Sequence, residues 1–146
     1  MADKLQKRVR FYVTRYGPGV SYIQNRAWVT FDNKEILSCS TIGWIRENYK
    51  LTGELRWNTN EQTEKELMEK GYFFRQTFVA ALVEYLGMPI DKATQSSNVI
   101  IRSIAMFDRR LGKRRLQSMH FSEDENPLVK SFYAIRCEVE GINSNS

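Results

Sequence analysis

The sequence predicts an α+β fold, in which an N-terminal antiparallel sheet of three or four strands packs against three main helices. Over residues 8–41, apolar and polar side chains alternate with a period of two, which is typical of half-buried strands. From residue 59 onward, apolar residues instead recur every three or four positions, as they do along amphipathic helices. A sheet of so few strands needs a cover, and the later helices can supply it.

Length and composition favour one folded domain over residues 1–146. The 42% hydrophobic share is ordinary for a globular protein, and the net charge of +5 favours encounters with anionic partners. No apolar run approaches the roughly 20 residues needed to cross a bilayer, and the basic start lacks the apolar stretch of a secretory signal. We therefore expect a cytoplasmic protein with no membrane partner and with reduced cysteines.

Three strands are expected to form a meander. The first covers residues 8–14, the second residues 26–31 and the third residues 35–41. Between the last two lie Asp32 and Asn33, which tolerate the positive φ angles that a tight hairpin turn requires. This spacing predicts that the second and third strands pair directly.

The segments around these strands are less regular. Residues 17–19, glycine-proline-glycine, are expected to turn the chain. Residues 41–48 favour a short helix, although they could also extend the third strand, and residues 51–57 could add an edge strand. Residues 1–7 are expected to fray because little there can be buried, and residues 142–146 form a flexible polar tail.

The first long helix is expected to begin at a capping box formed by Thr59 and Gln62, whose side chains satisfy free backbone donors. Gly71 within it predicts either close packing or a kink, and Gly87 ends it. Its apolar stripe comprises Leu67, Phe74, Phe78, Leu82 and Tyr85.

A second helix is expected within residues 97–116, after a short connection at residues 90–96. Gly112 is expected to end it, because Leu116 falls off the apolar stripe. The stripe comprises Ile100, Ile104, Phe107 and Leu111, and Arg102, Arg109 and Lys113 lie on the opposite side.

The third helix follows an acidic loop at residues 122–126. Asn126 can cap it, with Pro127 at its first position and Gly141 at its end. Cys137 lies opposite the expected stripe and should be partly exposed. That stripe comprises Leu128, Phe132, Ile135 and Val139.

The first candidate binding site is a basic segment, which we define as residues 109–115. Its cations are Arg109, Arg110, Lys113, Arg114 and Arg115, and Arg102 lies on the same helix. We expect this non-enzymatic site to contact nucleic acid or, second, an acidic protein. The alternative is internal: the cations could cap a helix C-terminus, or pair with the acidic residues 123–125.

The second candidate is the outward side of the sheet, which carries Arg8, Arg10, Tyr12, Arg26 and Trp28. Aromatic rings beside cations are what proteins that bind single-stranded nucleic acid use for bases and phosphates. The glycine-rich aromatic signature of an RRM domain is absent. The alternative is that a helix closes this side as a second half of the core.

Two further classes of function stay open. A protein-interaction module could use the aromatic residues Trp44, Tyr49 and Trp57, which could equally fill the core. An enzyme is ranked last, because His120 is the single histidine and no nucleophile, phosphate-loop or metal motif is present. A zinc site of Cys39, Cys137 and His120 would need a carboxylate as fourth ligand, and a cysteine–histidine nucleophile pair is formally possible, but no catalytic residue, metal or cofactor is assigned.

Two stretches, RVRFYVTRYGPGVSYIQNRAWVTFDNKEI and AMFDRRLGKRRL, carry a resemblance to a family of small uncharacterised bacterial proteins. The resemblance covers most of the chain and implies a bacterial cytoplasmic setting. It implies no activity, and no functional residue is carried over from it.

Overall fold

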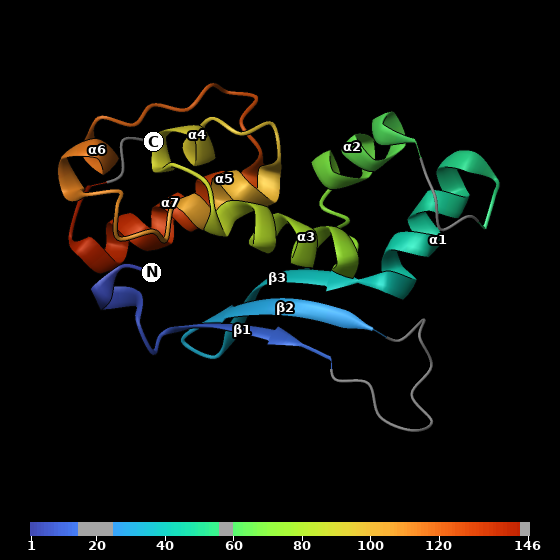
Figure 1. Ribbon diagram of the computed structural model, residues 1–146, viewed down its shortest axis with the longest axis horizontal. Helices are drawn as coiled ribbons and strands as arrows, with labels where there is room; N and C mark the ends of the chain where they lie inside the picture. The colour runs from blue at the N-terminus through green and yellow to red at the C-terminus, as the bar shows by residue number, and fades with distance from the viewer. Residues whose placement is uncertain (15–24, 56–59, 144–146) are drawn as a thin grey trace. The chain divides into compact units, whose positions relative to one another are not determined.

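The computed structural model describes residues 1–14, 25–55 and 60–143, and it has an α+β fold (Figure 1). A three-stranded antiparallel sheet near the N-terminus is followed by several helices, as predicted. The chain divides into two compact units, one of Val9–Ala80 and the other of Met1–Arg8 with Ala81–Ser146. Among the described residues, no helix combines the length and the apolar character that crossing a membrane requires.

The sheet forms the meander that the alternation predicted. Strands β1 (Val9–Val13), β2 (Arg26–Phe31) and β3 (Lys34–Ser40) are antiparallel neighbours in the order β1-β2-β3. Asp32 and Asn33 have φ angles of 48° and 65°, so β2 and β3 are joined by the two-residue turn with positive φ that the sequence favoured. The turn predicted at residues 17–19 lies outside the described residues.

One face of the sheet is apolar and belongs to the core. Phe78 of helix α3 (Arg75–Leu86) is fully buried and stacks on Phe11, with the ring centroids 6.5 Å apart. Because β1 is an edge strand, Phe11 itself stays 36% exposed. The buried residues of this face are Val9, Ala27, Val29, Leu37 and Cys39.

Helix α1 (Thr41–Thr52) follows β3 directly, so the helical prediction for residues 41–48 is confirmed. Ser40 caps it by accepting a hydrogen bond from the Gly43 backbone N–H at 3.3 Å. Gly53, with φ of 70°, ends it. The edge strand predicted at residues 51–57 is wrong over residues 51–55, because residues 51–53 are the end of α1 and its cap and residues 54–55 form no strand. Residues 56 and 57 lie outside the described residues.

The predicted first long helix is two helices, α2 (Glu61–Glu69) and α3. Gly71 separates them with φ of +87°, and nothing lies within 4 Å of a Cβ built there, so its role is a break in the chain and not close packing. Asn60 caps α2 by accepting from the Thr63 N–H at 2.8 Å. The capping role predicted for Thr59 lies outside the described residues. After α3, Gly87 ends the helix as expected.

The N-terminal residues are packed, contrary to expectation. A short 3-10 helix, η1 (Asp3–Leu5), places Leu5 fully inside the core, and Ala2 is 2% exposed. The Ala2 N–H donates to the Phe107 carbonyl at 2.8 Å. The prediction that little of residues 1–7 can be buried is therefore wrong.

The predicted helix within residues 97–116 is also divided. Helix α5 (Val99–Ala105) is followed by a turn and then by α6 (Lys113–Gln117), and a further short helix, α4 (Ile90–Thr94), occupies the expected connection. Gly112 therefore precedes a helix and does not end one. The predicted stripe is nevertheless buried throughout: Ile100, Ile104, Phe107 and Leu111.

The break after α5 has a local cause. The Asp108 carboxylate accepts a hydrogen bond from the Arg110 backbone N–H at 2.7 Å, a side-chain turn that competes with helical bonding. Leu116, expected to leave the core, is fully buried instead. Its carbonyl accepts a hydrogen bond from the Tyr133 hydroxyl at 2.8 Å.

Helix α7 (Pro127–Glu140) begins and ends as predicted. Asn126 accepts from the Leu128 N–H at 2.9 Å, and Gly141 ends the helix with φ of 68°. Its buried face is rotated from the predicted stripe, and Cys137 is 1% exposed, so the expectation of a partly exposed thiol is wrong. The buried residues are Val129, Phe132, Tyr133, Arg136 and Cys137.

We predict that Gly71→Ala lowers the free energy of unfolding by about 1–2 kcal/mol, because an L-residue is strained at this positive φ. Urea unfolding measures the change. The matched control is Gly87→Ala, which has equal free space and no positive φ, and should change stability by less than about 0.5 kcal/mol. Equal effects of the two substitutions would contradict this account of the α2–α3 break.

Candidate functional site

Four of the predicted sheet residues share the polar face of β1 and β2. Tyr12 lies directly opposite Trp28 in the register, and Arg10 and Arg26 are each two residues away on the same strands. Side chains two apart on a strand point to the same side, so these four form one surface, which we call the aromatic face. Arg8, also predicted for this surface, precedes β1 and belongs to the other compact unit.

The aromatic face is built around two stacked rings. The Tyr12 and Trp28 centroids lie 5.0 Å apart, with an interplanar angle of 11°. The guanidinium carbon of Arg26 lies 4.4 Å from the Trp28 centroid, within cation–π range, and Arg26 also pairs with Glu35 of β3. Arg10 is exposed and both rings are half-buried, so this side is not a closed second half of the core.

The basic segment, in contrast, is largely occupied by internal contacts. Arg110 donates to Asp108 through Nε at 3.0 Å and Nη2 at 2.7 Å, and through Nη1 to the Met88 carbonyl at 2.9 Å. The Tyr85 hydroxyl donates to the same carboxylate. Arg110 and Arg109 lie in the turn after α5, so their predicted place in a last helical turn is wrong.

The Asp108 carboxyl carries a strongly shifted pKa. Its side chain is 8% exposed, and burial alone would raise its pKa. The hydrogen bonds from Arg110 and Tyr85, together with the charge of Arg110, outweigh burial and lower the pKa of Asp108 to about 2. Burial and the bond to Asp108 raise the pKa of Tyr85 to about 12.

Other predicted cations also have acidic or carbonyl partners. Lys113 donates to the Glu140 carbonyl at 3.0 Å, and Arg115 pairs with Asp91. Within residues 1–14, 25–55 and 60–143, no hydrogen bond or ion pair is found for the exposed side chains of Arg109 and Arg114.

Most of the predicted cations are therefore paired within the protein, but mainly with acidic residues other than residues 123–125, which the sequence had indicated. Of residues 123–125, Glu125 contributes its side chain, which accepts from Arg102 at 2.8 Å. Arg102 also donates to the Ser96 carbonyl at 2.6 Å. The sequence did contain a signal for Asp108, because an aspartate often forms a turn by accepting from the backbone N–H two residues later, here that of Arg110. Asp91 and Glu140 are distant in sequence from the cations they pair with, so no local pattern indicated them.

The groups considered for catalysis do not form a reactive site in the described parts of the chain. Cys39 and Cys137 are both buried free thiols, and burial raises the pKa of Cys39 to about 12, which disfavours the thiolate needed for nucleophilic attack or metal binding. His120 is exposed. No group of three histidine, cysteine or acidic residues in these parts is arranged to hold a metal ion.

The aromatic residues considered for protein interaction have different environments. Trp44 is 2% exposed and packs with Leu67 and Phe74, so it belongs to the core. Tyr49 is half exposed, and Trp57 lies outside the described residues.

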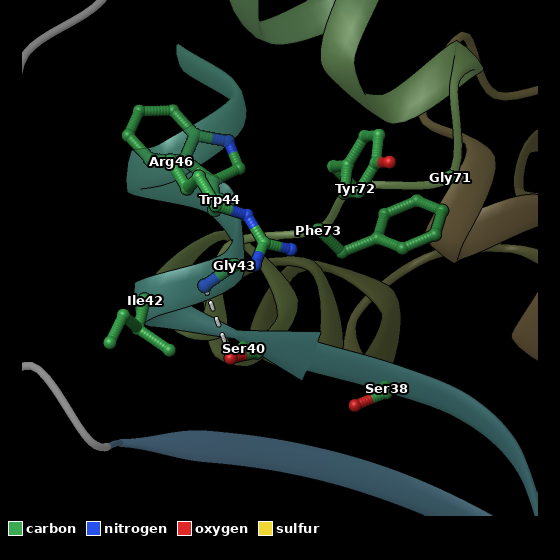
Figure 2. A pocket seen from close by; sticks show the side chains of 9 residues that line it. All are labelled: Ser38, Ser40, Ile42, Gly43, Trp44, Arg46, Gly71, Tyr72 and Phe73. Carbon is green, nitrogen blue, oxygen red and sulfur yellow. Dashed lines mark hydrogen bonds between the residues drawn. The ribbon is translucent and has the colours of Figure 1, made fainter. Parts of the chain in front are cut away.

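A pocket of about 500 Å³ lies beside the start of α1, and no sequence pattern indicated it (Figure 2). It combines residues from β3, α1 and the segment after α2, so its walls come from distant parts of the sequence. Its wall is mostly apolar, with Ile42 and Tyr72 among the exposed apolar residues of the chain. We call it the edge pocket; it is lined by Ser38, Ser40, Ile42, Gly43, Trp44, Arg46, Gly71, Tyr72 and Phe73.

Fold and sites together define a small α+β protein with an aromatic, cationic sheet face and an apolar pocket. The chain belongs to the SF0329 protein family, whose model matches residues 1–137. This match confirms the resemblance to an uncharacterised family over most of the chain. Neither a curated protein nor a solved structure matches the sequence significantly.

We predict that Asp108→Asn lowers the free energy of unfolding at pH 7 by about 2 kcal/mol, because lowering the carboxyl pKa from 3.8 to about 2 on folding corresponds to roughly this much stability. Because the folded pKa is below the unfolded one, this stability is present above pH 4 or so and disappears as the pH falls through about 2. Urea unfolding at pH 7 and near pH 2 should therefore show a difference between wild type and variant that shrinks in acid.

The control for this pair is Asp91→Asn, which removes the 69% exposed partner of Arg115. An exposed ion pair contributes little, so this variant should lose no more than about 0.5 kcal/mol. A difference for Asp108→Asn that is independent of pH would contradict the proposed linkage.

Proposed function

We propose that this protein is a non-catalytic binding protein that takes single-stranded nucleic acid on its aromatic face. The observation that carries the proposal is the stacked Tyr12–Trp28 pair, half-buried on an open strand face and accompanied by Arg10 and Arg26. Aromatic rings on such a face stack bases of any sequence, while guanidinium groups contact the phosphates. The cytoplasmic, bacterial setting expected from the sequence forms part of this proposal.

The internal pairing of the basic segment moves the proposed contact from that segment to the sheet. A phosphate could engage Arg110 only by competing with the buried Asp108 carboxylate, and Arg102, Lys113 and Arg115 also have partners. Arg109 is exposed, as is Arg114, so these two can add a weaker, sequence-independent attraction.

The test is fluorescence anisotropy with a short fluorescein-labelled oligothymidylate over a series of salt concentrations. If Arg10 and Arg26 each neutralise one phosphate, Arg26 by releasing its exposed ion pair with Glu35, the log–log dependence of affinity on salt should have a slope of about −1.4. Tyr12→Thr, which keeps a β-forming residue but removes the ring, should weaken binding by about tenfold, the value of one lost base stack.

The matched charge variants are Arg10→Ser on the aromatic face and Arg114→Ser in the basic segment, since both remove one exposed guanidinium. We expect the first to weaken binding and reduce the slope more than the second. No salt-sensitive binding by the wild type would refute nucleic-acid binding. A larger effect of Arg114→Ser would return the contact to the basic segment.

A further inference from the structure

The outer edge of β3 presents backbone groups that can accept another strand. The Thr41 N–H donates to the Asn25 carbonyl at 3.0 Å, so these two residues, next to the Arg26–Ser40 pair, continue the β2–β3 register as a hydrogen-bonded pair. Hydrogen-bonded and non-hydrogen-bonded pairs alternate along an antiparallel ladder. Ser38 is three residues before Thr41, so it belongs to a non-hydrogen-bonded pair. Its N–H and C=O point away from β2, and β3 has no neighbour on that side in the described sheet.

The edge pocket lies along this same edge. Two residues of β3 line it, Ser38 and Ser40, and the backbone N–H groups of both point away from β2. Leu37 and Cys39, whose backbone N–H groups point toward β2, do not line it. Figure 2 shows the β3 edge below the hollow, with Tyr72 and Phe73 on the opposite side. A peptide that binds by adding a strand to a sheet uses unpaired backbone N–H and C=O groups along the edge and pockets that receive its alternate side chains.

The pocket contains an N–H donor that no described residue satisfies, which calls for an acceptor in the partner. Trp44 is 2% exposed, and its indole Nε1 finds no hydrogen-bond acceptor among the described residues. Figure 2 shows this nitrogen on the side of the ring toward Tyr72. A buried N–H without an acceptor costs free energy, which a bound acceptor would recover.

Arg46 adds a positive charge at the same place. Its side chain is 70% exposed, and its one ion pair in the described chain, at 3.4 Å to Glu47, uses Nε. Lys50 holds the same carboxylate more closely, at 2.8 Å. The first turn of α1 contains no acidic residue, so its N-terminal dipole is also uncompensated from within the helix.

We propose that the β3 edge binds an extended peptide segment of a partner protein, with an apolar side chain in the edge pocket and a carboxylate held by Arg46 and the Trp44 indole N–H. The segment adds as a further strand through the N–H and C=O of Ser38. This surface adjoins the aromatic face, because Ser38 lies opposite Trp28 and Ser40 opposite Arg26 in the register, but its partner is a peptide and not nucleic acid.

The test uses a panel of fluorescein-labelled, end-blocked peptides in which threonine and valine alternate around one glutamate, placed at each position in turn. Each has a glutamine counterpart. We expect at least one glutamate peptide to bind about tenfold more tightly than its counterpart, because charge-assisted hydrogen bonds are the strong ones. Arg46→Gln should remove this preference, and Trp44→Phe should weaken binding of the same peptide.

Strand addition itself is tested by Ser38→Pro, which removes an outward N–H without breaking the β2–β3 ladder. Val13→Pro is the matched control on the opposite edge of the sheet, at β1. The Thr14 N–H donates to the Arg26 carbonyl of β2, so the N–H of the preceding residue, Val13, points away from β2 and off that edge. Ser38→Pro should abolish peptide binding, and Val13→Pro should leave it unchanged. Should Ser38→Pro fail to fold, Arg46→Gln still decides the case.

Three results would overturn the proposal: no glutamate peptide binds, glutamate and glutamine peptides bind equally, or Ser38→Pro binds as the wild type does. Sedimentation of the free protein gives a further outcome. A dimer that Ser38→Pro dissociates would assign the edge to a second copy of this chain and not to a peptide partner.

Discussion

Both proposed surfaces depend on the antiparallel register that the turn at Asp32 and Asn33 imposes on β2 and β3. Because side chains alternate along a strand, a shift of one residue would carry Trp28 to the core side and Val29 to the open side. The same register decides which backbone groups of β3 point off the edge. The aromatic face and the edge pocket are therefore two consequences of one constraint.

Positive charge in this protein is abundant, but its availability is decided by its partners. The five cations of the basic segment would give a strong anion site if all were solvated. Asp108, whose carboxylate is buried, instead holds the exposed Arg110 through several hydrogen bonds, and Asp91 and Glu140 engage Arg115 and Lys113. A buried carboxylate with several hydrogen bonds is a strong competitor for a guanidinium, whereas an exposed one is weak.

Local signals in the sequence predicted much of the fold. The β2–β3 hairpin follows from alternation and two turn residues, and Asn126 and Gly141 mark both ends of α7. Two of the failures were also local in origin. Gly71 and Asp108 each break a helix, although the apolar periodicity continues across them, because the side chains beyond each break return to the same core.

Residue patterns in the chain were enough to give the three-strand meander followed by helices, both ends of α7 and four residues of the aromatic face, since each depends on residues only a few positions apart or on the strict alternation of a strand. The tertiary structure alone decided that Cys137 is buried, that Asp91 neutralises Arg115, and that residues 38–46 and 71–73 enclose a pocket. Burial and ion pairing depend on which distant segments pack together. A repeating pattern within one segment carries no information about its neighbour.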